Sequence, residues 1–368
     1  MYHQEACPDG WCKYGSGRIS SSNNGNRRRS RTHSHRNLLW SGHWPVVFHK
    51  QTGTLLYSLL VLWSFYWQSN GRVEGFTMCI LSDAYNKHTI VRNNVIERVP
   101  GDGIVPIGCD STLIEYNLMC DSPDILPMTE AAAGIWPWSC DNTIIQYNEV
   151  WGHKAPWDAQ GFDSDYNCQN TLIQYNYSHD NYGGMVLICN SGNAGNYSCG
   201  NIGSIIRYNI SIGDGIRPKE TRQGMFSPSI HIAGPVKQTL VERNIIHANL
   251  KPSDIIDRTM ITSDSWDGYA DNTCFRQNIY YAAEPSRFDF TSSTRNAFEE
   301  NIYIGQFKNL PESPKNKKAE NFYTEKVLKE SADGYKGLHC LMDSIKVKEH
   351  TLHYIKPEAI KTFFQSIF

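Results

Sequence analysis

The chain has 368 residues, of which 40% are hydrophobic and 12% aromatic, and its formal net charge at pH 7 is −2. A chain of this length can form one large elongated domain or two ordinary ones. Its near-neutral charge argues against binding of nucleic acid or of an acidic polymer through bulk electrostatic attraction. The eleven cysteines are an odd number, and none shows the CxxC spacing typical of a zinc site. We therefore expect most cysteines to be buried as small apolar residues, with some disulfides as the alternative, and we predict no metal centre.

Residues 1–75 have an atypical composition. Between residues 10 and 73 there is no Asp or Glu, but there are nine Lys and Arg. An apolar run extends from Thr54 to Trp67, but its 14 residues are fewer than a membrane span needs, and it starts too far from Met1 for an ordinary secretory signal. A signal anchor is the alternative. We predict no stable membrane insertion and interpret much of residues 1–75 as a non-native leader.

A short motif recurs from about Phe76 onward. Its copies end in Asn, and most alternate apolar and polar residues, which is the pattern of a β-strand with one buried face. Such self-similarity along the chain indicates a repeat architecture. The copies are TIVRNN (89–94), TLIEYN (112–117), TIIQYN (143–148), TLIQYN (171–176), SIIRYN (204–209), TLVERN (239–244), TCFRQN (273–278) and FEEN (298–301).

The terminal asparagines of these copies predict how each repeat closes. Asn suits a turn, because its side chain bonds nearby backbone and tolerates left-handed dihedral angles. Identical side chains stacked at the ~4.8 Å strand spacing can also bond one another as a ladder. We predict such a ladder through Asn94, Asn117, Asn148, Asn176, Asn209, Asn244, Asn278 and Asn301.

A glycine precedes a second predicted strand in most repeats, at Gly103, Gly134, Gly161, Gly184 and Gly224. Two strands and an Asn turn per repeat, with length variation absorbed in one loop, predict an all-β fold, a right-handed parallel β-helix over residues 76–305. The chain here resembles the β-helix group that includes pectin lyases, polygalacturonases, epimerases and several glycoside hydrolases. The resemblance implies a carbohydrate-active protein that is secreted or periplasmic. We expect a monomer without a cofactor, with calcium as the alternative.

Residues 306–368 lose the repeat and become Lys-rich and then apolar. The open end of a solenoid needs a cover. We therefore predict that residues 306–368 form a linker and a C-terminal cap.

Side chains of a strand alternate between its two faces, so the glycines predict which residues point outward. The first and third positions after each glycine are expected to face inward: Ile104, Ile135, Phe162, Met185 and Met225, then Pro106, Pro137, Ser164, Leu187 and Ser227. The second and fourth positions are expected to face outward: Val105, Ile107, Trp136, Trp138, Asp163, Asp165, Val186, Ile188, Phe226 and Pro228.

The outward set predicts a candidate catalytic site. Asp163 and Asp165 should lie roughly 6 to 7 Å apart by strand geometry, one coil away from Trp136 and Trp138 on the same face. Glycoside cleavage needs two carboxyl groups about 5 to 9 Å apart, one as acid and one as nucleophile or base. The two tryptophans would bind the sugar. Turn capping, calcium binding and a solvated surface are the alternatives for the two aspartates.

The loops before the second strands add further candidates. Glu130, Asp158 and Asp180 each precede a glycine by three or four residues, which predicts that they project from one rim. Asp158 and the pair His179 and Asp180 are candidates for a third acid or an acid–base partner, with turn capping as the alternative. His179 also aligns with His247, three residues past the terminal Asn, which suggests a structural role for at least one of them. Candidates for contacting a uronate carboxylate, or for a lyase base, are Lys154, Arg217, Lys219 and Arg222.

Three functions remain open on these residues. The leading hypothesis is a glycoside hydrolase that cleaves a polysaccharide or oligosaccharide. A lyase or epimerase acting on uronic-acid glycans is the second, and a non-catalytic glycan-binding β-helix is the third. The NTD, DD, GHG and RIK motifs of polygalacturonases are absent from the sequence, which weakens any transfer of residues from that family.

Overall fold

The computed structural model describes residues 86–192, 200–218, 220, 226–248 and 259–313, together with short strands outside these ranges. The outlying strands are β1 (Leu60–Leu62), β2 (Gln68–Ser69), β3 (Arg72–Val73), β4 (Met78–Leu81), β30 (Lys317–Lys318), β31 (Lys346–Glu349) and β32 (Leu352–Ile355). The described residues all lie within one compact unit, Val47–Phe368. Within the described residues, no helix is long and apolar enough to cross a membrane. The predicted leader and cap lie mostly outside the described residues.

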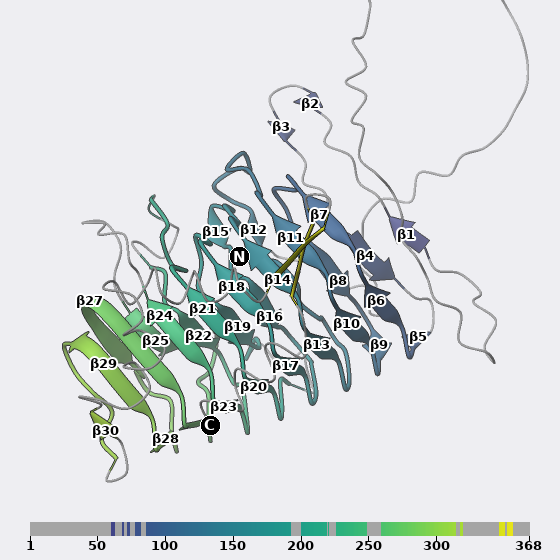
Figure 1. Cartoon of the computed structure of the whole chain (residues 1–368). Coiled ribbons are helices and arrows are strands. Elements are labelled where there is room, and N and C mark those ends of the chain that lie inside the picture. Colours follow the sequence, from purple (N-terminus) through teal and green to yellow (C-terminus); the bar gives the residue numbers. More distant parts are fainter. Residues whose placement is uncertain are drawn as a thin grey trace, which may run out of the picture. The chain divides into compact units, whose positions relative to one another are not determined.

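The described residues form three parallel sheets that follow one another around each coil of the solenoid (Figure 1). The first sheet consists of β6 (Ile90–Arg92), β10 (Leu113–Glu115), β13 (Ile144–Gln146), β17 (Leu172–Gln174), β20 (Ile205–Arg207), β23 (Leu240–Glu242), β26 (Cys274–Arg276) and β28 (Ala297–Glu299). The second consists of β7 (Val95–Glu97), β11 (Leu118–Cys120), β14 (Glu149–Trp151), β18 (Tyr177–His179), β21 (Ile210–Ile212), β24 (Ile245–Ala248), β27 (Ile279–Asp289) and β29 (Ile302–Phe307).

The third sheet carries the candidate site. It consists of β16 (Phe162–Ser164), β19 (Val186–Cys189), β22 (Ile230–Ala233) and β25 (Thr259–Asp264), and it joins the second sheet through the long strand β27. Bridges from Ile104 of β8 (Ile104–Pro106) to Ile135, and from Ile135 to Phe162, continue it toward the N-terminus, where β8 pairs with β4. Shorter pairs are β5 (Asn86–Lys87) with β9 (Cys109–Asp110), and β12 (Ala131–Ala132) with β15 (Trp157–Asp158).

This arrangement is a parallel β-helix, which confirms the predicted fold. Equivalent residues pair in register from coil to coil, as Ile114, Ile145 and Ile173 do in the first sheet. The number of strands per coil was predicted wrongly, since most described coils have three and not two. The missed strand lies directly after the terminal Asn, and its length of three or four residues in most coils is too short for alternation to be recognised in the sequence.

The predicted asparagine ladder is present along its full length. From Asn117 to Asn301, each side-chain oxygen accepts hydrogen bonds from the backbone N and from Nδ2 of the Asn one coil earlier, and Asn94 is the first donor. Asn176, for example, donates through Nδ2 to Asn209 Oδ1 at 3.0 Å and to Ile145 O at 2.9 Å. The ladder asparagines from Asn117 to Asn301 are buried, so these bonds satisfy the polar groups at a corner of the core.

The left-handed conformation at this corner falls on the residue before the ladder Asn, and not on the Asn itself as predicted. Tyr147 has φ 56° and Tyr175 has φ 55°. The tyrosine rings at this position stack from coil to coil, with centroids 5.3 Å apart for Tyr147 and Tyr175 and 5.1 Å apart for Tyr175 and Tyr208. The Asn is free to bond along the ladder because its neighbour provides the turn.

The glycine alignment is correct for three coils and wrong for the next two. A Cβ on Gly134 would lie 2.2 Å from Gly161 O, so this close approach requires glycine. The backbone N of Gly161 donates to Gly184 O, and Phe162 pairs with Val186, so Gly184 lies one position earlier than the alignment assumed. A slip of one residue exchanges the two faces of a strand.

The predicted orientations therefore change beyond β16. Val186 and Ile188 were expected outside but pack in the main core, whereas Leu187, expected inside, packs with Cys189 in a separate outer cluster. In the following coil the strand β22 begins at Ile230, beyond Gly224, so the alignment of Met225, Phe226, Ser227 and Pro228 was also wrong. Gly224 and Met225 lie outside the described residues.

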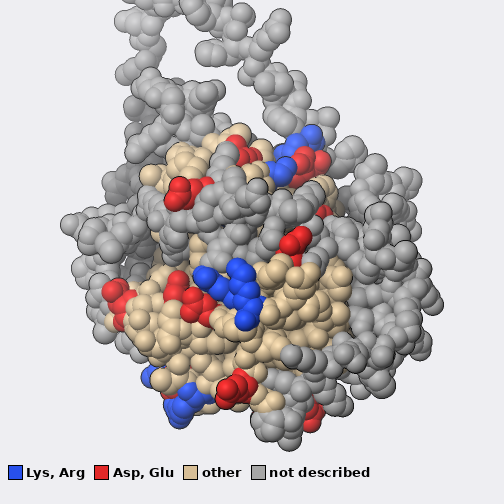
Figure 2. All heavy atoms as spheres, turned by 90° about the vertical axis from the view of Figure 1, so that its left-hand side faces the viewer, with Lys and Arg blue, Asp and Glu red and all other residues tan. Residues whose placement is uncertain are grey.

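The interior of the coils is filled by apolar side chains, including the buried Cys109, Cys140 and Cys168. These three cysteines are free and buried, which confirms the small-apolar role expected for them. Cys189 belongs to the separate outer cluster, with Leu187 and Ala233. On the face seen in Figure 2, described acidic and basic residues lie interspersed among other residues.

Candidate active site

Two columns of outward-facing side chains run along the third sheet. The backbone N of Trp136 donates to Ile104 O, and that of Asp163 donates to Ile135 O, which places Trp136 and Asp163 at equivalent positions of adjacent coils. With the strand registers beyond β16, the first column is Val105, Trp136, Asp163, Leu187, His231 and Thr262. The second is Ile107, Trp138, Asp165, Cys189, Ala233 and Asp264. The predicted neighbourhood of the two aspartates and two tryptophans is thus confirmed.

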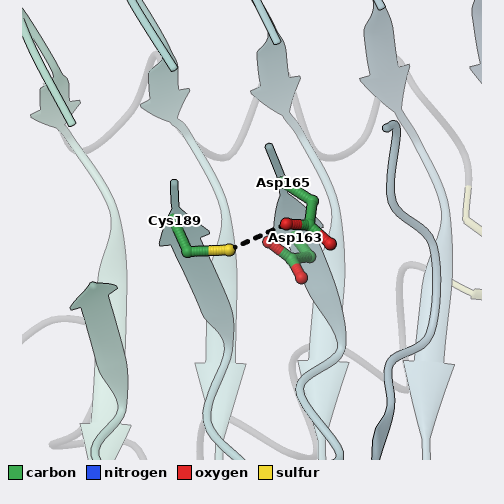
Figure 3. Close-up of side chains that lie close together, drawn as sticks. All are labelled: Asp163, Asp165 and Cys189. Atoms are coloured by element: carbon green, nitrogen blue, oxygen red, sulfur yellow. Dashed lines mark hydrogen bonds between the residues drawn. The ribbon is translucent and has the colours of Figure 1, made fainter. Parts of the chain in front are cut away.

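Asp163, Asp165 and Cys189 converge on this face, each offering one oxygen or sulfur atom within 4.8 Å of the others (Figure 3). Asp165 Oδ1 accepts hydrogen bonds from the backbone N of Tyr166 at 2.6 Å and from Cys189 Sγ at 3.0 Å. Asp163 is 3% exposed, and its buried Oδ1 has no hydrogen-bond partner. Two carboxyl groups so close cannot both ionise without a large electrostatic cost.

The pKa values of both aspartates are raised, mainly because burial disfavours the charged form. The pKa of Asp165 is raised to about 7, although its hydrogen bonds from Cys189 and Tyr166 act in the opposite direction. The pKa of Asp163 is raised well above its usual value by burial and then by the charge of Asp165. Burial thus favours the neutral form of Asp163, and Asp165, with a pKa of about 7, exchanges its proton near neutral pH.

Asp158, on β15 of a separate two-stranded sheet, is a third carboxyl group that interacts electrostatically with these two aspartates. Its charge contributes to raising the pKa of both Asp163 and Asp165. Burial raises the pKa of Asp158 to about 6, against the opposing charges of His231 and Arg217. The charge of Asp102 also raises the pKa of Asp163 and of Asp165. Asp102 Oδ1 accepts a 3.0 Å hydrogen bond from Trp136 Nε1.

Aromatic side chains border the cluster on both sides. The rings of Trp136 and Trp138 are 6.1 Å apart and tilted by 32°, and Tyr166 meets Trp138 edge-on at 5.9 Å. Trp266 meets Tyr166 at 6.2 Å and His231 at 5.8 Å, again edge-on. All three tryptophans are partly exposed. Aromatic surfaces beside acids provide the apolar and polar contacts that a sugar ring requires.

His179 and Asp180, predicted as acid–base candidates, lie on the second sheet and not in this cluster. His179 Nδ1 lies 2.9 Å from Asp180 Oδ2 and His179 Nε2 lies 3.1 Å from Glu149 Oε1. The imidazole also stacks on Tyr177 at 4.3 Å. His179 and His247 share one column of the second sheet, as their alignment predicted.

The other predicted contact residues have local partners. Lys154 Nζ lies 3.7 Å from Asp121 Oδ1, and Thr129 Oγ1 donates to Glu130 Oε1 at 3.2 Å. Arg217 is 3% exposed and donates to three backbone carbonyl oxygens, so its guanidinium does not face solvent as uronate binding would require. Lys219 and Arg222 lie outside the described residues.

Several residues of the site were missed in the sequence. His231 Nε2 lies 2.9 Å from Asp264 Oδ1, and Cys189 bonds Asp165 directly. The glycine alignment, which is shifted by one residue here, did not place Cys189 and His231 on the outward face. In SIHIA (229–233) the apolar residues alternate with His231, and this alternation indicates the correct register. Asp102 and Trp266 lie outside the aligned strands and had no such signal.

The convergence of Asp163, Asp165 and Cys189 raises the question of a metal ion. Burial and the neighbouring acids raise the pKa of the Cys189 thiol well above its usual value, so this sulfur is protonated and acts as a hydrogen-bond donor. Calcium prefers oxygen ligands, and a protonated thiol is not one of them. Calcium binding stays a prediction.

No protein-family model matches the sequence, and no curated protein sequence matches it. A solved structure with similarity to this chain is the GH136 lacto-N-biosidase from Eubacterium ramulus, with 23% sequence identity and a TM-score of 0.33. The match covers 58% of this chain and 28% of that chain, so this protein spans less than a third of the length of that structure. A likeness of this degree carries no information about the activity of this chain.

Proposed function

We propose that this protein is a glycoside hydrolase, with Asp165 as the proton donor and Asp158 as the second catalytic carboxylate. The observation that carries the proposal is the convergence of Asp163 and Asp165, both with raised pKa, on the face that also carries Trp136 and Trp138. Asp158, whose pKa is also raised, interacts electrostatically with both. Strongly shifted carboxyl groups cluster at catalytic sites more often than elsewhere.

The roles follow from what glycoside cleavage requires. One carboxylic acid protonates the leaving oxygen, and one carboxylate acts as nucleophile or base. Asp165, with a pKa of about 7, holds a proton that it can give up near neutral pH, and its Oδ1 is occupied by two donors, which leaves Oδ2 for that proton. Asp158, with a pKa of about 6, is mostly ionised at pH 7.

Asp163 is assigned a supporting role, which revises the pairing expected from strand geometry alone. Its 3% exposure leaves its carboxyl group without access to a sugar, whereas Asp158 and Asp165 are both partly exposed. In its neutral form, which burial favours, Asp163 adds no negative charge beside Asp165. This allows one of the remaining acids to ionise while the other stays protonated.

A lyase or epimerase acting on uronates is less well supported. Such enzymes need a cation to neutralise the substrate carboxylate, and the described candidates Lys154 and Arg217 are engaged with Asp121 and with backbone carbonyls. A substrate that is neutral around the cleaved bond fits these residues better.

The test is hydrolysis of a panel of neutral and uronic-acid glycans, measured as new reducing ends and as the absorbance of unsaturated uronides. We expect reducing ends without unsaturated product. Asp165→Asn and Asp158→Asn should each lower kcat/KM by about a thousandfold, within the range for loss of an acid–base group. Asp289→Asn, at the far end of β27, is the matched control and should retain full activity.

Three outcomes would contradict this proposal. Unsaturated product would identify a lyase, and binding of a glycan without turnover would identify a glycan-binding module. Full activity of Asp165→Asn would show that the proton comes from another group. Asp163→Asn is expected to be folded and to shift the pH profile more than it lowers the maximal rate.

A further inference from the structure

Asp158 lies on a loop whose backbone is held in an unfavourable conformation. Asp158 has φ 57° and the next residue, Ala159, has φ 59°, both in the left-handed region that residues other than glycine rarely adopt. Such a conformation persists only where the surrounding structure enforces it. The strand pairing of the loop is limited to β15 with the two residues of β12.

The side-chain contact that holds this loop comes from an arginine two coils further along the chain. Arg217 Nη1 donates to Ala155 O at 2.7 Å and to Pro156 O at 2.6 Å, and its Nη2 donates to Asp158 O at 2.8 Å. The side chain is 3% exposed, and Nε has no hydrogen-bond partner. The planar guanidinium thus spans the loop that carries Asp158, with no carboxylate hydrogen-bonded to it among the described contacts.

Arg217 is itself anchored by the coil from which it extends. Asp214, 1% exposed, accepts hydrogen bonds from Ser211 Oγ at 2.6 Å and from Asn181 Nδ2 at 2.9 Å. The glycines on either side of Asp214 have φ 66° and φ 78°, and the backbone N of Gly215 donates to Gly183 O at 2.7 Å. The segment GDGIR (213–217) is therefore a rigid support for the guanidinium.

Gly183 of the intervening coil supports the same loop from close range. Its backbone N donates to Ala159 O at 3.1 Å, and a Cβ at this position would lie 2.1 Å from Asp158 O. Only glycine allows this approach. The loop is thus held between Arg217 and Gly183.

We infer that Arg217 is a positioning residue that fixes Asp158, and thereby the direction of its carboxyl group, through the backbone of residues 155–158. This inference deepens the proposed function and rests on it for the catalytic consequence. It also replaces the expectation that Arg217 binds a substrate carboxylate. A lysine cannot substitute, because one ammonium group cannot reproduce the planar fork that spans three carbonyl oxygens.

The test compares Arg217→Lys and Arg217→Met with wild type in the full chain. Amide hydrogen exchange should accelerate by roughly tenfold or more in residues 155–160, since hydrogen bonds from a charged donor are lost, while exchange in the first sheet stays unchanged. Carboxyl carbon-13 titration should show a higher pKa for Asp158 in Arg217→Met, because a positive charge that lowers it is removed. Arg243→Lys, whose guanidinium bonds Gln277 and Tyr208 on the first sheet, is the matched control.

Unchanged exchange in residues 155–160 together with an unchanged Asp158 pKa would overturn the inference. Should both Arg217 variants fail to fold, Gly183→Ala provides the same test from the other side of the loop and should accelerate exchange in residues 155–160. These measurements need no substrate. If they give the expected result while wild type hydrolyses no glycan, the proposed function fails and the positioning of Asp158 stands. If wild type is active, Arg217→Lys should lower kcat more than it changes KM.

Discussion

At the scale of single residues, Asp163 and Asp165 show how neighbouring groups give different pKa values to two identical side chains on one face of a strand. Both belong to the segment FDSD (162–165) and both point outward. Asp163 is buried with an unpartnered oxygen, whereas Asp165 is partly exposed and accepts two hydrogen bonds. Burial therefore favours the neutral form of Asp163, whereas the two hydrogen-bond donors oppose the effect of burial on Asp165, whose pKa is about 7.

The thiol of Cys189 should tune the proton donor. Its hydrogen bond lowers the pKa of Asp165, so Cys189→Ala is expected to raise this pKa above about 7, and Cys189→Ser to restore most of the effect. Carboxyl carbon-13 titration measures the pKa of Asp165, and the alkaline limb of the pH–activity profile should move to higher pH in Cys189→Ala. Cys274→Ala, on the first sheet, is the control. An Asp165 pKa that is equal in all variants would exclude this role.

At the scale of elements, the corner between the first and second sheets is formed by two adjacent columns of residues, one that makes the turn and one that bonds from coil to coil. The residue before the ladder Asn takes the left-handed conformation, and the Asn bonds along the solenoid. This division explains how tyrosine can occupy the turn position in four coils. The same corner orients each coil and so determines where the third sheet places its outward residues.

Removing one ladder side chain should be costly. Asn176→Ala leaves the backbone N of Asn148 without its acceptor in a buried corner and removes the side-chain bonds to Asn148 and Asn209, and we expect the free energy of unfolding to fall by about 2 to 4 kcal/mol. Gln174→Ala, which loses two hydrogen bonds on the partly exposed face of the same coil, should cost less than about 1 kcal/mol. Chemical denaturation compares them. Equal losses would show that the ladder contributes no more than surface contacts.

At the scale of the whole molecule, the buried acids make stability depend on pH. The pKa values of Asp158 and Asp214 are raised to about 6 and that of Asp165 to about 7, in each case mainly by burial. Between about pH 4 and pH 7 the folded protein therefore binds more protons than the unfolded chain, and stability falls as pH rises. His153 opposes this trend, because burial lowers its pKa to about 4, but it is one group against at least three.

We expect the Tm to decrease as the pH rises from 4 to 8, because stability is lost until the pH has passed the raised pKa values of the folded state. Asp165→Asn should flatten this decrease and raise the Tm at pH 8 by a few degrees while changing little at pH 4, as for an active-site acid whose charge destabilises the fold. Scanning calorimetry of wild type, Asp165→Asn and Asp289→Asn across this range is the measurement. A Tm that rises between pH 4 and pH 7 would show that the acids are not buried as described.

The sequence by itself determined the β-helix, the asparagine ladder and the pairing of Trp136 and Trp138 with Asp163 and Asp165, because these depend on a repeat and on strand alternation, which are local properties. The tertiary structure alone decided the rest of the site. Cys189 and His231 lie at the site because the strand register is shifted by one residue at Gly184, which the spacing of the glycines did not indicate. His179 lies on another sheet, where its strand pairs with β21. Arg217 reaches the loop of Asp158 across two coils, a contact set by stacking and not by spacing along the chain. Burial, which raises the pKa values on which the proposed chemistry rests, is likewise a property of the assembled coils.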